Sequence, residues 1–242
     1  MSHDSGTHEL MPNTRELSVP MPAASSVTAR VYEAVAASRD ATLILAHGAG
    51  AGQDSPFMVA FAGALAALGI DTVTFNFGYM EQRRRVPDRR PLLEACYRSV
   101  VEQVRKDVPA ARRALFIGGK SMGGRIATHV ATDAELALDG VVLLGYPLHP
   151  PGRPEERRDA HLAAVVAPML FVQGSRDAFG TPAELAPVVS SLGDRATLHV
   201  VHGGDHSLKV GKAATPGQAT VLAGVQQVIS HWMATVGADL ER

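Results

Sequence analysis

The segment that decides the fold is Gly119-Lys120-Ser121-Met122-Gly123, which matches the pattern Gly-x-Ser-x-Gly. It follows an apolar run that ends at Gly118 and precedes a helical pattern that continues to Val130. A serine at the tip of such a strand-to-helix turn has a strained backbone, and a side chain two residues away on either side collides with the neighbouring chain. The two glycines therefore predict a sharp turn that exposes the hydroxyl group of Ser121.

Short apolar runs alternate with helical patterns on both sides of this turn. The runs predict six buried strands, over residues 42–46, 72–77, 114–117, 141–144, 169–172 and 198–201. Helical spacing and capping residues predict helices from Ser55-Pro56 to Leu68, from 91 to 106, from Thr181 onward and over 221–236. Strands joined by helices pair in parallel, because a return to the same sheet edge needs a long crossover. We therefore expect an α/β fold, a mostly parallel twisted sheet with helices on both faces and no separate cap domain.

The composition is that of an ordinary globular protein. The chain has 242 residues, of which 46% are hydrophobic and 19% charged, and these values exclude disordered, collagen-like and coiled-coil chains. Residues 1–26 are polar and aperiodic, so we expect an N-terminal tail or edge segment there and a single domain over 27–242. Residues 1–26 have no apolar signal-peptide core, and no run in the chain is long enough to span a membrane.

Charge and cysteine content exclude several classes of partner and site. The formal net charge is −1, so no overall field attracts nucleic acid or an anionic membrane. Cys96 is the only cysteine, which excludes an internal disulfide and a cysteine-rich zinc site. We expect a cytoplasmic protein, a monomer or a homodimer, that needs no metal and no cofactor.

Two further strand ends carry the groups that a nucleophilic serine requires. Ligands of parallel sheets bind beyond the carboxyl ends of the strands. Serine needs an imidazole to accept its proton, and the imidazole needs a carboxylate that fixes its tautomer. Asp177 follows the run 169–172, and His206 follows the run 198–201. Because the chain order of Ser121, Asp177 and His206 is the order found with this turn type, we predict a catalytic triad.

Acyl transfer also needs two backbone N–H groups that bind the oxyanion of the tetrahedral intermediate. The residue after the nucleophile, Met122, provides one of them. The run 42–46 leads into a loop of small residues, in which Ala49 or Gly50 is placed to provide the second, and we favour Ala49. We expect His47 to form hydrogen bonds within this loop rather than to act as a base.

These motifs resemble an α/β-hydrolase of the dienelactone-hydrolase-like kind. More narrowly, they resemble the hydrolase-like family that includes testis-expressed protein 30 and the third subunit of the non-specific lethal histone acetyltransferase complex. The resemblance covers roughly residues 27–235. It is carried by His47-Gly48-Ala49-Gly50, Asn76-Phe77-Gly78-Tyr79, Gly118-Gly119-Lys120-Ser121-Met122-Gly123-Gly124-Arg125, Gly145-Tyr146-Pro147-Leu148-His149-Pro150, Gln173-Gly174 with Asp177, and Gly204-Asp205-His206. It implies the fold, the triad and a hydrolase whose natural substrate is not established.

Two loops that follow strand ends are placed to line a pocket, residues 78–90 and 147–160. We expect the substrate to contact Gly50, Lys120, Arg125, Tyr79 and His149. Both loops are rich in arginine, with Arg83, Arg84, Arg85, Arg89 and Arg90 in the first and Arg153, Arg157 and Arg158 in the second. Either these side chains form a solvated face, or they form a rim that binds an anionic substrate.

Each candidate residue also has a plainer interpretation. Ser121 is also suited to cap a helix in a glycine-rich turn, and Asp177 to form a turn. His202 is an alternative base to His206. These two histidines and Asp205 also suggest a metal site, but its ligands would need a helix, which the two glycines after His202 disfavour.

The residues together predict a serine hydrolase that cleaves a small carboxylic ester or thioester through an acyl-enzyme on Ser121. The partner is then a small-molecule acyl substrate. The alternative is a non-catalytic module of the same fold that lends its surface to a protein complex, as some relatives do. A peptidase is a lesser alternative.

Overall fold

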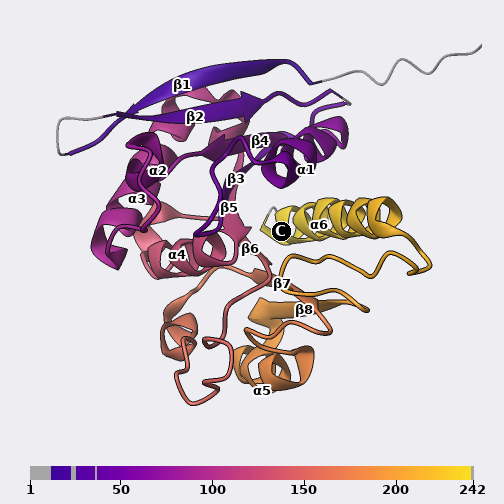
Figure 1. The fold of residues 1–242 in the computed structure, drawn as a ribbon. Helices are drawn as coiled ribbons and strands as arrows, with labels where there is room; N and C mark the ends of the chain where they lie inside the picture. Colours follow the sequence, from indigo (N-terminus) through magenta and orange to yellow (C-terminus); the bar gives the residue numbers. More distant parts are fainter. Residues whose placement is uncertain (1–11, 23–25, 36, 241–242) are drawn as a thin grey trace, which may run out of the picture.

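The computed structural model describes residues 12–22, 26–35 and 37–240 (Figure 1). Within them one eight-stranded sheet has the order β1-β2-β4-β3-β5-β6-β7-β8. The strands are β1 (Thr14–Pro20), β2 (Ser26–Tyr32), β3 (Ala41–Ala46), β4 (Asp71–Phe75), β5 (Ala114–Lys120), β6 (Gly140–Leu144), β7 (Met169–Gly174) and β8 (Ala196–Val201). Strands β3 to β8 are parallel, whereas β1 and β2 are antiparallel additions at one edge. The prediction of a mostly parallel sheet is confirmed.

Helices cover both faces of this sheet. They are α1 (Pro56–Ala67), α2 (Gly78–Glu81), α3 (Arg90–Asp107), α4 (Met122–Val130), α5 (Pro182–Leu192) and α6 (Gln218–Leu240). Because successive side chains of a strand point to opposite faces, Leu43 packs in one cluster with α1 and α6, and Ile44 packs in another with α3, α4 and α5. The described residues contain no separate cap domain.

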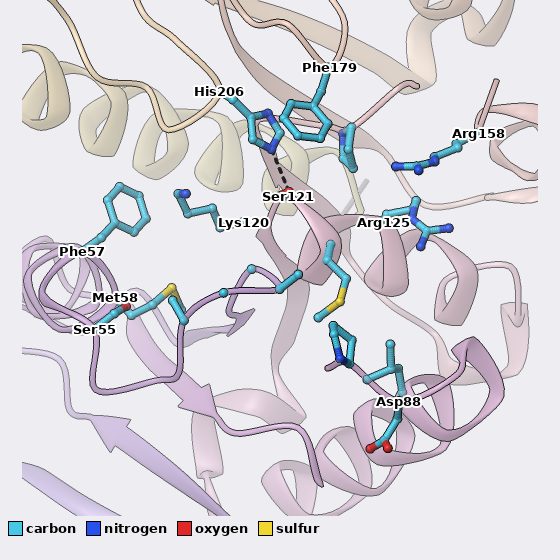
Figure 2. A pocket seen from close by; sticks show the side chains of 18 of the residues that line it. Ser55, Phe57, Met58, Asp88, Lys120, Ser121, Arg125, Arg158, Phe179 and His206 are labelled. Carbon is cyan, nitrogen blue, oxygen red and sulfur yellow. Dashed lines mark hydrogen bonds between the residues drawn. The ribbon is translucent and has the colours of Figure 1, made fainter. Parts of the chain in front are cut away.

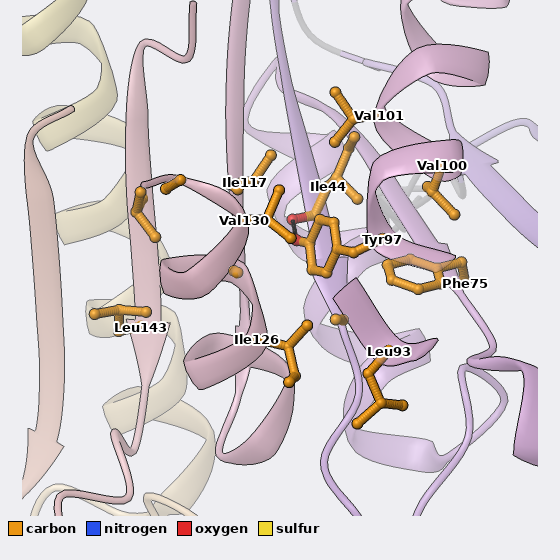
Figure 3. Close-up of a cluster of buried hydrophobic side chains, with 14 of the residues drawn as sticks. Ile44, Phe75, Leu93, Tyr97, Val100, Val101, Ile117, Ile126, Val130 and Leu143 are labelled. Atoms are coloured by element: carbon orange, nitrogen blue, oxygen red, sulfur yellow. Dashed lines mark hydrogen bonds between the residues drawn. The ribbon is translucent and has the colours of Figure 1, made fainter. Parts of the chain in front are cut away.

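Helix α3 is attached to the centre of the sheet through Tyr97. The Tyr97 hydroxyl group accepts a hydrogen bond from Gly118 N–H (3.0 Å) and lies 2.7 Å from Gly118 O and 3.0 Å from Ile44 O. Around this ring Leu93, Val100 and Ile126 form an apolar layer between the helices and the strands (Figure 3). The hydroxyl group therefore ties α3 to β3 and β5 at the point where β5 leads into the Gly-x-Ser-x-Gly turn.

Two of the six strand predictions differ from the structure, and the N-terminal stretch expected to be a tail or edge segment contains an edge strand. The strand expected over 72–77 ends at Phe75, because the chain then leaves the sheet. Strand β8 is half-exposed except at Val201, because it lies at the sheet edge. Residues 14–20 of the N-terminal stretch form the other edge strand, in which only Leu17 and Val19 are buried, and one buried face gives a weak signal. Residues 1–11 and 23–25 of that stretch lie outside the described residues.

The predicted helices correspond to α1, α3, α5 and α6. The capping box expected at Thr181 is present, since its hydroxyl group accepts a hydrogen bond from Glu184 N–H and the Glu184 carboxylate accepts one from Thr181 N–H. Among the described residues, no helix combines the length and the apolar content that a membrane span requires.

Candidate active site

The carboxyl ends of β5, β7 and β8 bring Ser121, Asp177 and His206 together. His206 Nε2 lies 2.7 Å from Ser121 Oγ, and Figure 2 shows this hydrogen bond at the centre of a cleft. On the other side of the ring, His206 Nδ1 lies 2.9 Å from Asp177 Oδ2 and 3.0 Å from Oδ1. A carboxylate only accepts hydrogen bonds, so Nδ1 carries the proton and Nε2 of the neutral ring is free to accept one from the Ser121 hydroxyl group.

Ser121 occupies a strained position in the turn between β5 and α4. Its φ is 52° and its ψ is −117°, in a region that residues with side chains seldom adopt. A Cβ atom at Gly119 would lie 2.6 Å from Ala46 O, and one at Gly123 would lie 2.5 Å from the same atom. Both glycines are therefore required for the steric reason that the sequence pattern predicts.

Asp177 is completely buried and has a full set of hydrogen-bond donors. Besides His206, its carboxylate accepts hydrogen bonds from Phe179 N–H and from Gln173 Nε2, each at 2.8 Å. These donors come from both sides of the turn after β7. They fix the carboxylate in the orientation in which it accepts a hydrogen bond from His206 Nδ1–H.

Gln173 is a buried residue to which the sequence analysis assigned no role. Its Oε1 atom accepts a hydrogen bond from Tyr146 N–H (2.8 Å), and Nε2 donates to Gly180 O (2.7 Å) as well as to Asp177. Gln173 therefore connects the loops after β6 and β7 to the carboxylate. The available signal was an amide at the end of an apolar run, since a buried polar side chain requires partners.

Two further contacts define the surroundings of His206. The Phe179 ring stacks on the imidazole, with the ring centroids 4.0 Å apart and an angle of 24° between the planes. Asp205 forms the turn that carries His206, because its Oδ1 atom accepts hydrogen bonds from Ser207 N–H (2.8 Å) and Lys209 N–H (2.9 Å). The sequence does not predict this role of Phe179, because an aromatic residue in a loop matches no motif.

The expected oxyanion-hole residues lie beside Ser121. Met122 is the first residue of α4, so its N–H group has no acceptor within the helix. Ala49 and Gly50 are exposed in the loop after β3 and line the same cleft as Ser121. The backbone N–H groups of this loop are therefore near enough to the cleft to meet a bound substrate.

His47 supports the loop from inside. Its Nδ1 atom lies 2.8 Å from Gly48 O, and its Nε2 atom accepts a hydrogen bond from Phe77 N–H at 3.2 Å. Burial lowers the pKa of His47 to about 4, so the ring is neutral at neutral pH. His47 thus forms hydrogen bonds within the loop, as the sequence analysis expects.

A cleft of about 660 Å³ opens beside Ser121 and His206. Three of the five predicted substrate-binding residues line it, namely Gly50, Lys120 and Arg125. The other two predictions are wrong. Tyr79 is completely buried against Phe77 and His47, and the side chain of His149 is buried, with Nδ1 2.8 Å from Pro150 O and Nε2 3.2 Å from Glu184 Oε1. Their loops fold back onto the core, so these side chains point away from the cleft.

The cleft has two chemically different sides (Figure 2). On one side lie Phe57, Met58 and Lys120, whose Nζ atom is 5.4 Å from the centroid of the Phe57 ring and 3.2 Å from Ser207 Oγ. On the other side lie Arg125 and Arg158. The sequence analysis assigned no role to Phe57 and Met58, because apolar residues at helical spacing are typical of an ordinary core-facing helix.

The arginine-rich loops contribute less to the cleft than their sequence suggests. Of the cluster over 83–90, only Arg90 lines the cleft, whereas Arg83, Arg84 and Arg85 line a separate surface hollow. Of the arginines in the second loop, only Arg158 reaches it. The remaining arginines of both loops are exposed, as expected for a solvated face.

The alternatives based on His202 find no support. His202 is exposed just after β8 and does not line the cleft. In the part of the chain that the structure describes, no three His, Cys, Asp or Glu side chains gather where they could hold a metal ion.

Comparison with known proteins identifies the family. The model of a family described as "Alpha/beta hydrolase domain" matches residues 39–234, so the chain belongs to this family. Its fold is similar to an α/β serine hydrolase without a lid from Xanthomonas campestris (TM-score 0.71, 21% identity, covering 91% of this chain and 95% of that one). It is also similar to a dienelactone hydrolase from Anabaena variabilis (TM-score 0.71, 19% identity, 92% and 97% covered). A third similar structure is an α/β serine hydrolase homologue from Coxiella burnetii (TM-score 0.70, 18% identity, 92% and 98% covered). At these identities the likeness concerns the fold alone.

Proposed function

We propose that this member of the alpha/beta hydrolase family is a serine hydrolase that cleaves a small carboxylic ester or thioester through an acyl-enzyme on Ser121. The observation that carries the proposal is the continuous chain of hydrogen bonds from Ser121 Oγ through both nitrogens of His206 to Asp177. This chain opens onto a cleft large enough for a small acyl compound. A merely structural turn has no need for all three groups in this order.

The first half of the reaction acylates the serine. His206 Nε2 takes the proton of Ser121 Oγ as the oxygen attacks the carbonyl carbon, and the carbonyl electron pair moves to its oxygen. The N–H groups of Met122 and Ala49 bind this oxyanion. When the carbonyl re-forms, the bond to the leaving group breaks, and the imidazolium gives its proton to the departing oxygen or sulfur atom.

The second half releases the acyl group. His206 takes a proton from a water molecule, whose oxygen attacks the acyl carbon. The tetrahedral intermediate collapses with cleavage of the bond to Ser121 Oγ, which recovers the proton from His206, and the carboxylic acid departs. Asp177 stabilises the imidazolium in both halves. Side chains, backbone N–H groups and water supply every proton and electron pair, so the proposed reaction uses no metal and no cofactor.

The narrower resemblance belongs to the same proposal. The motifs around Ser121, Asp177 and His206 are similar to those of the hydrolase-like family of testis-expressed protein 30. We place the protein in the cytoplasm, as a monomer or a homodimer that acts on a small molecule. The net charge of −1 and the single cysteine support this assignment.

Covalent labelling with a fluorophosphonate tests the proposal. The expected result is a single adduct on Ser121, located by mass spectrometry, which is absent in Ser121→Ala and strongly reduced in His206→Ala. The matched control is His202→Ala, since His202 is exposed nearby and lies outside the cleft. An unreactive Ser121 in folded wild-type protein would overturn the proposal and favour the non-catalytic interaction module.

A panel of substrates with one acyl group distinguishes the bond that is cleaved. The ester is phenyl acetate, the thioester is S-phenyl thioacetate and the amide is acetanilide. We expect turnover of the ester or thioester at least a hundredfold faster than that of the amide, because an anilide is the poorer leaving group. Faster cleavage of the anilide would instead identify a peptidase.

A further inference from the structure

Two arginines converge on one side of the cleft beside Ser121 (Figure 2). Arg125 lies on α4, one helical turn after Ser121. Arg158 lies in the loop after β6, and its backbone is fixed, since its N–H group donates to Leu148 O (2.9 Å) and its carbonyl oxygen accepts from Tyr146 Oη (2.6 Å). The fold therefore holds both positions firmly.

Neither guanidinium group has a partner in the described part of the chain. No carboxylate lies within ion-pair distance of Arg125 or Arg158, and no side-chain hydrogen bond involves their guanidinium nitrogens. The Nε atom of Arg125 is buried without an acceptor. A buried donor without a partner is costly, so its presence in a cleft indicates a partner that comes from outside the chain.

The carboxylates on this side of the cleft are already paired with other arginines. The ion pairs are Asp88 with Arg84 (2.5 Å), Glu94 with Arg90 (3.2 Å) and Asp159 with Arg157 (2.6 Å). Arg125 and Arg158 therefore remain as two positive charges in excess. Burial, together with the charge of Arg158, lowers the pKa of Arg125 from its ordinary value, although Tyr146 and Glu94 act in the opposite direction.

The remaining titratable groups in this region do not offset the excess. His129 and His161 stack on each other with their ring centroids 3.6 Å apart, and His161 Nε2 lies 2.8 Å from Thr128 Oγ1. Burial and the charges of Arg125 and Arg90 together lower the pKa of His161 to about 4, and the same causes with the neighbouring His161 ring lower that of His129 to about 3. Both rings are neutral at neutral pH, so they add no charge of either sign.

From this arrangement we infer that the substrate of the cleft is an anion, an acyl compound whose carboxylate or phosphate group is bound by Arg125 and Arg158. The inference rests on the proposed function, since it names the substrate class of the same site. Planar guanidinium groups match the oxygens of carboxylate and phosphate with paired N–H donors. The uncharged end of the substrate lies across Ser121, against the apolar side chains of Phe57 and Met58, on the side that also carries Lys120.

Matched neutral and anionic esters test the inference. On the acyl side, the phenyl hemiester of glutaric acid is compared with phenyl valerate, which has the same number of acyl carbons and no carboxylate. On the leaving-group side, 4-acetoxybenzoate and 4-acetoxyphenyl phosphate are compared with 4-methylphenyl acetate. The measured quantity is the ratio of kcat/KM for the anionic ester to that for its neutral match. We expect a ratio above ten in at least one pair, and that pair tells which part of the substrate carries the charge.

The variants Arg125→Gln and Arg158→Gln connect the ratio to the two side chains. Each is expected to lower it about tenfold to a hundredfold, because each removes charge-assisted hydrogen bonds. The matched control is Arg153→Gln, since Arg153 lies in the same loop, is exposed and pairs with Glu156, and its ratio should equal that of the wild type. Arg158→Lys keeps the charge and is expected to retain part of the preference.

The outcomes separate this inference from the proposed function. Ratios near one in the wild type, or ratios that neither arginine variant lowers, overturn the inference while hydrolysis of neutral esters leaves the proposed function intact. Absence of both ester hydrolysis and fluorophosphonate labelling overturns both. Because the measurement is a ratio within one protein sample, a partly unfolded variant does not change its meaning.

Discussion

Asp177 and Arg125 differ in whether their charged groups have hydrogen-bond partners within the described chain. The Asp177 carboxylate is buried and accepts hydrogen bonds from Gln173, Phe179 and His206. The guanidinium groups of Arg125 and Arg158 lie in the cleft beside Ser121 without any acceptor among the described residues. The carboxylate that orients His206 has all its partners before substrate binds, whereas the arginines that we infer to bind substrate have none within the described chain.

The largest expected effect is on kcat, when the fully hydrogen-bonded Asp177 is replaced. Asp177→Asn keeps the size of the side chain but offers an N–H donor or a neutral acceptor to His206. The tautomer of the imidazole is then no longer fixed, and the imidazolium has no counter-charge. We expect kcat to fall about 10⁴-fold, as for other triads of this kind. Steady-state kinetics on the best ester of the panel measures this loss. A fall of less than tenfold would show that Asp177 does not orient His206.

Acid should weaken the fold through His47, a second buried group that the chain satisfies completely. Its pKa is about 4 in the folded protein and near 6.5 in the unfolded chain, so the unfolded chain binds more protons between these values. The stability contribution is therefore complete above pH 6.5 and decreases as pH falls toward 4. It amounts to at most about 3 kcal/mol.

Chemical denaturation between pH 4 and pH 7 measures this dependence. The variant His47→Gln is expected to show a weaker pH dependence, because glutamine does not titrate. His231→Gln, on the exposed face of α6, serves as the control and should follow the wild type. An equal pH dependence in wild type and His47→Gln would contradict the prediction.

Replacing Gln173 removes hydrogen bonds around Asp177 without changing a charged residue. Gln173→Leu leaves Tyr146 N–H and Gly180 O without partners and removes one donor from Asp177. We expect a loss of about 2 kcal/mol in the free energy of unfolding. We also expect a reduction in kcat with little change in KM, since Gln173 positions Asp177 and lines no part of the cleft. Gln173→Glu retains an acceptor for Tyr146 N–H but sets a buried carboxylate against Asp177 Oδ2 and Gly180 O, so it should recover neither the stability nor kcat.

The smallest effect is expected on the free energy of unfolding, when the unpaired Arg158 is replaced. Arg158→Gln should change the free energy of unfolding by less than about 0.5 kcal/mol, or stabilise slightly, because it breaks no hydrogen bond within the described chain and relieves repulsion with Arg125. Urea denaturation of this variant beside Gln173→Leu tests the comparison directly. A loss near 2 kcal/mol at Arg158 would mean that its guanidinium group supports the fold rather than a ligand.

Local sequence was sufficient to predict the elements near the reacting residues. The apolar run before Gly119 and the helical pattern after Ser121 predicted β5 and α4, and the two glycines predicted the turn between them. The strand end before Asp177 was also visible, because the buried strand β7 is a contiguous apolar run, and the run 198–201 marked the end before His206 although β8 is half-exposed. The short edge strand over 14–20 carried a weaker signal, because only alternate side chains are buried.

The direction of individual loop side chains was not predictable in the same way. Tyr79 and His149 belong to motifs of the resemblance and follow strand ends, yet both are buried away from the cleft. Gln173 is near Asp177 in the sequence, but its bonds to Tyr146 and Gly180 depend on how the loops after β6 and β7 meet.

The sequence by itself determined the α/β architecture, the strained turn at Ser121 and the order of the acid and the histidine, because each depends on residues that are neighbours in the chain. Only the tertiary structure decided which charges converge on the cleft. Arg84, Arg90 and Arg157 pair with carboxylates two or four residues away in the chain, whereas Arg125 on α4 and Arg158 in the loop after β6 meet beside Ser121 because the fold brings them together. The distance between two charges that are far apart in the chain is set by the packing of the whole chain.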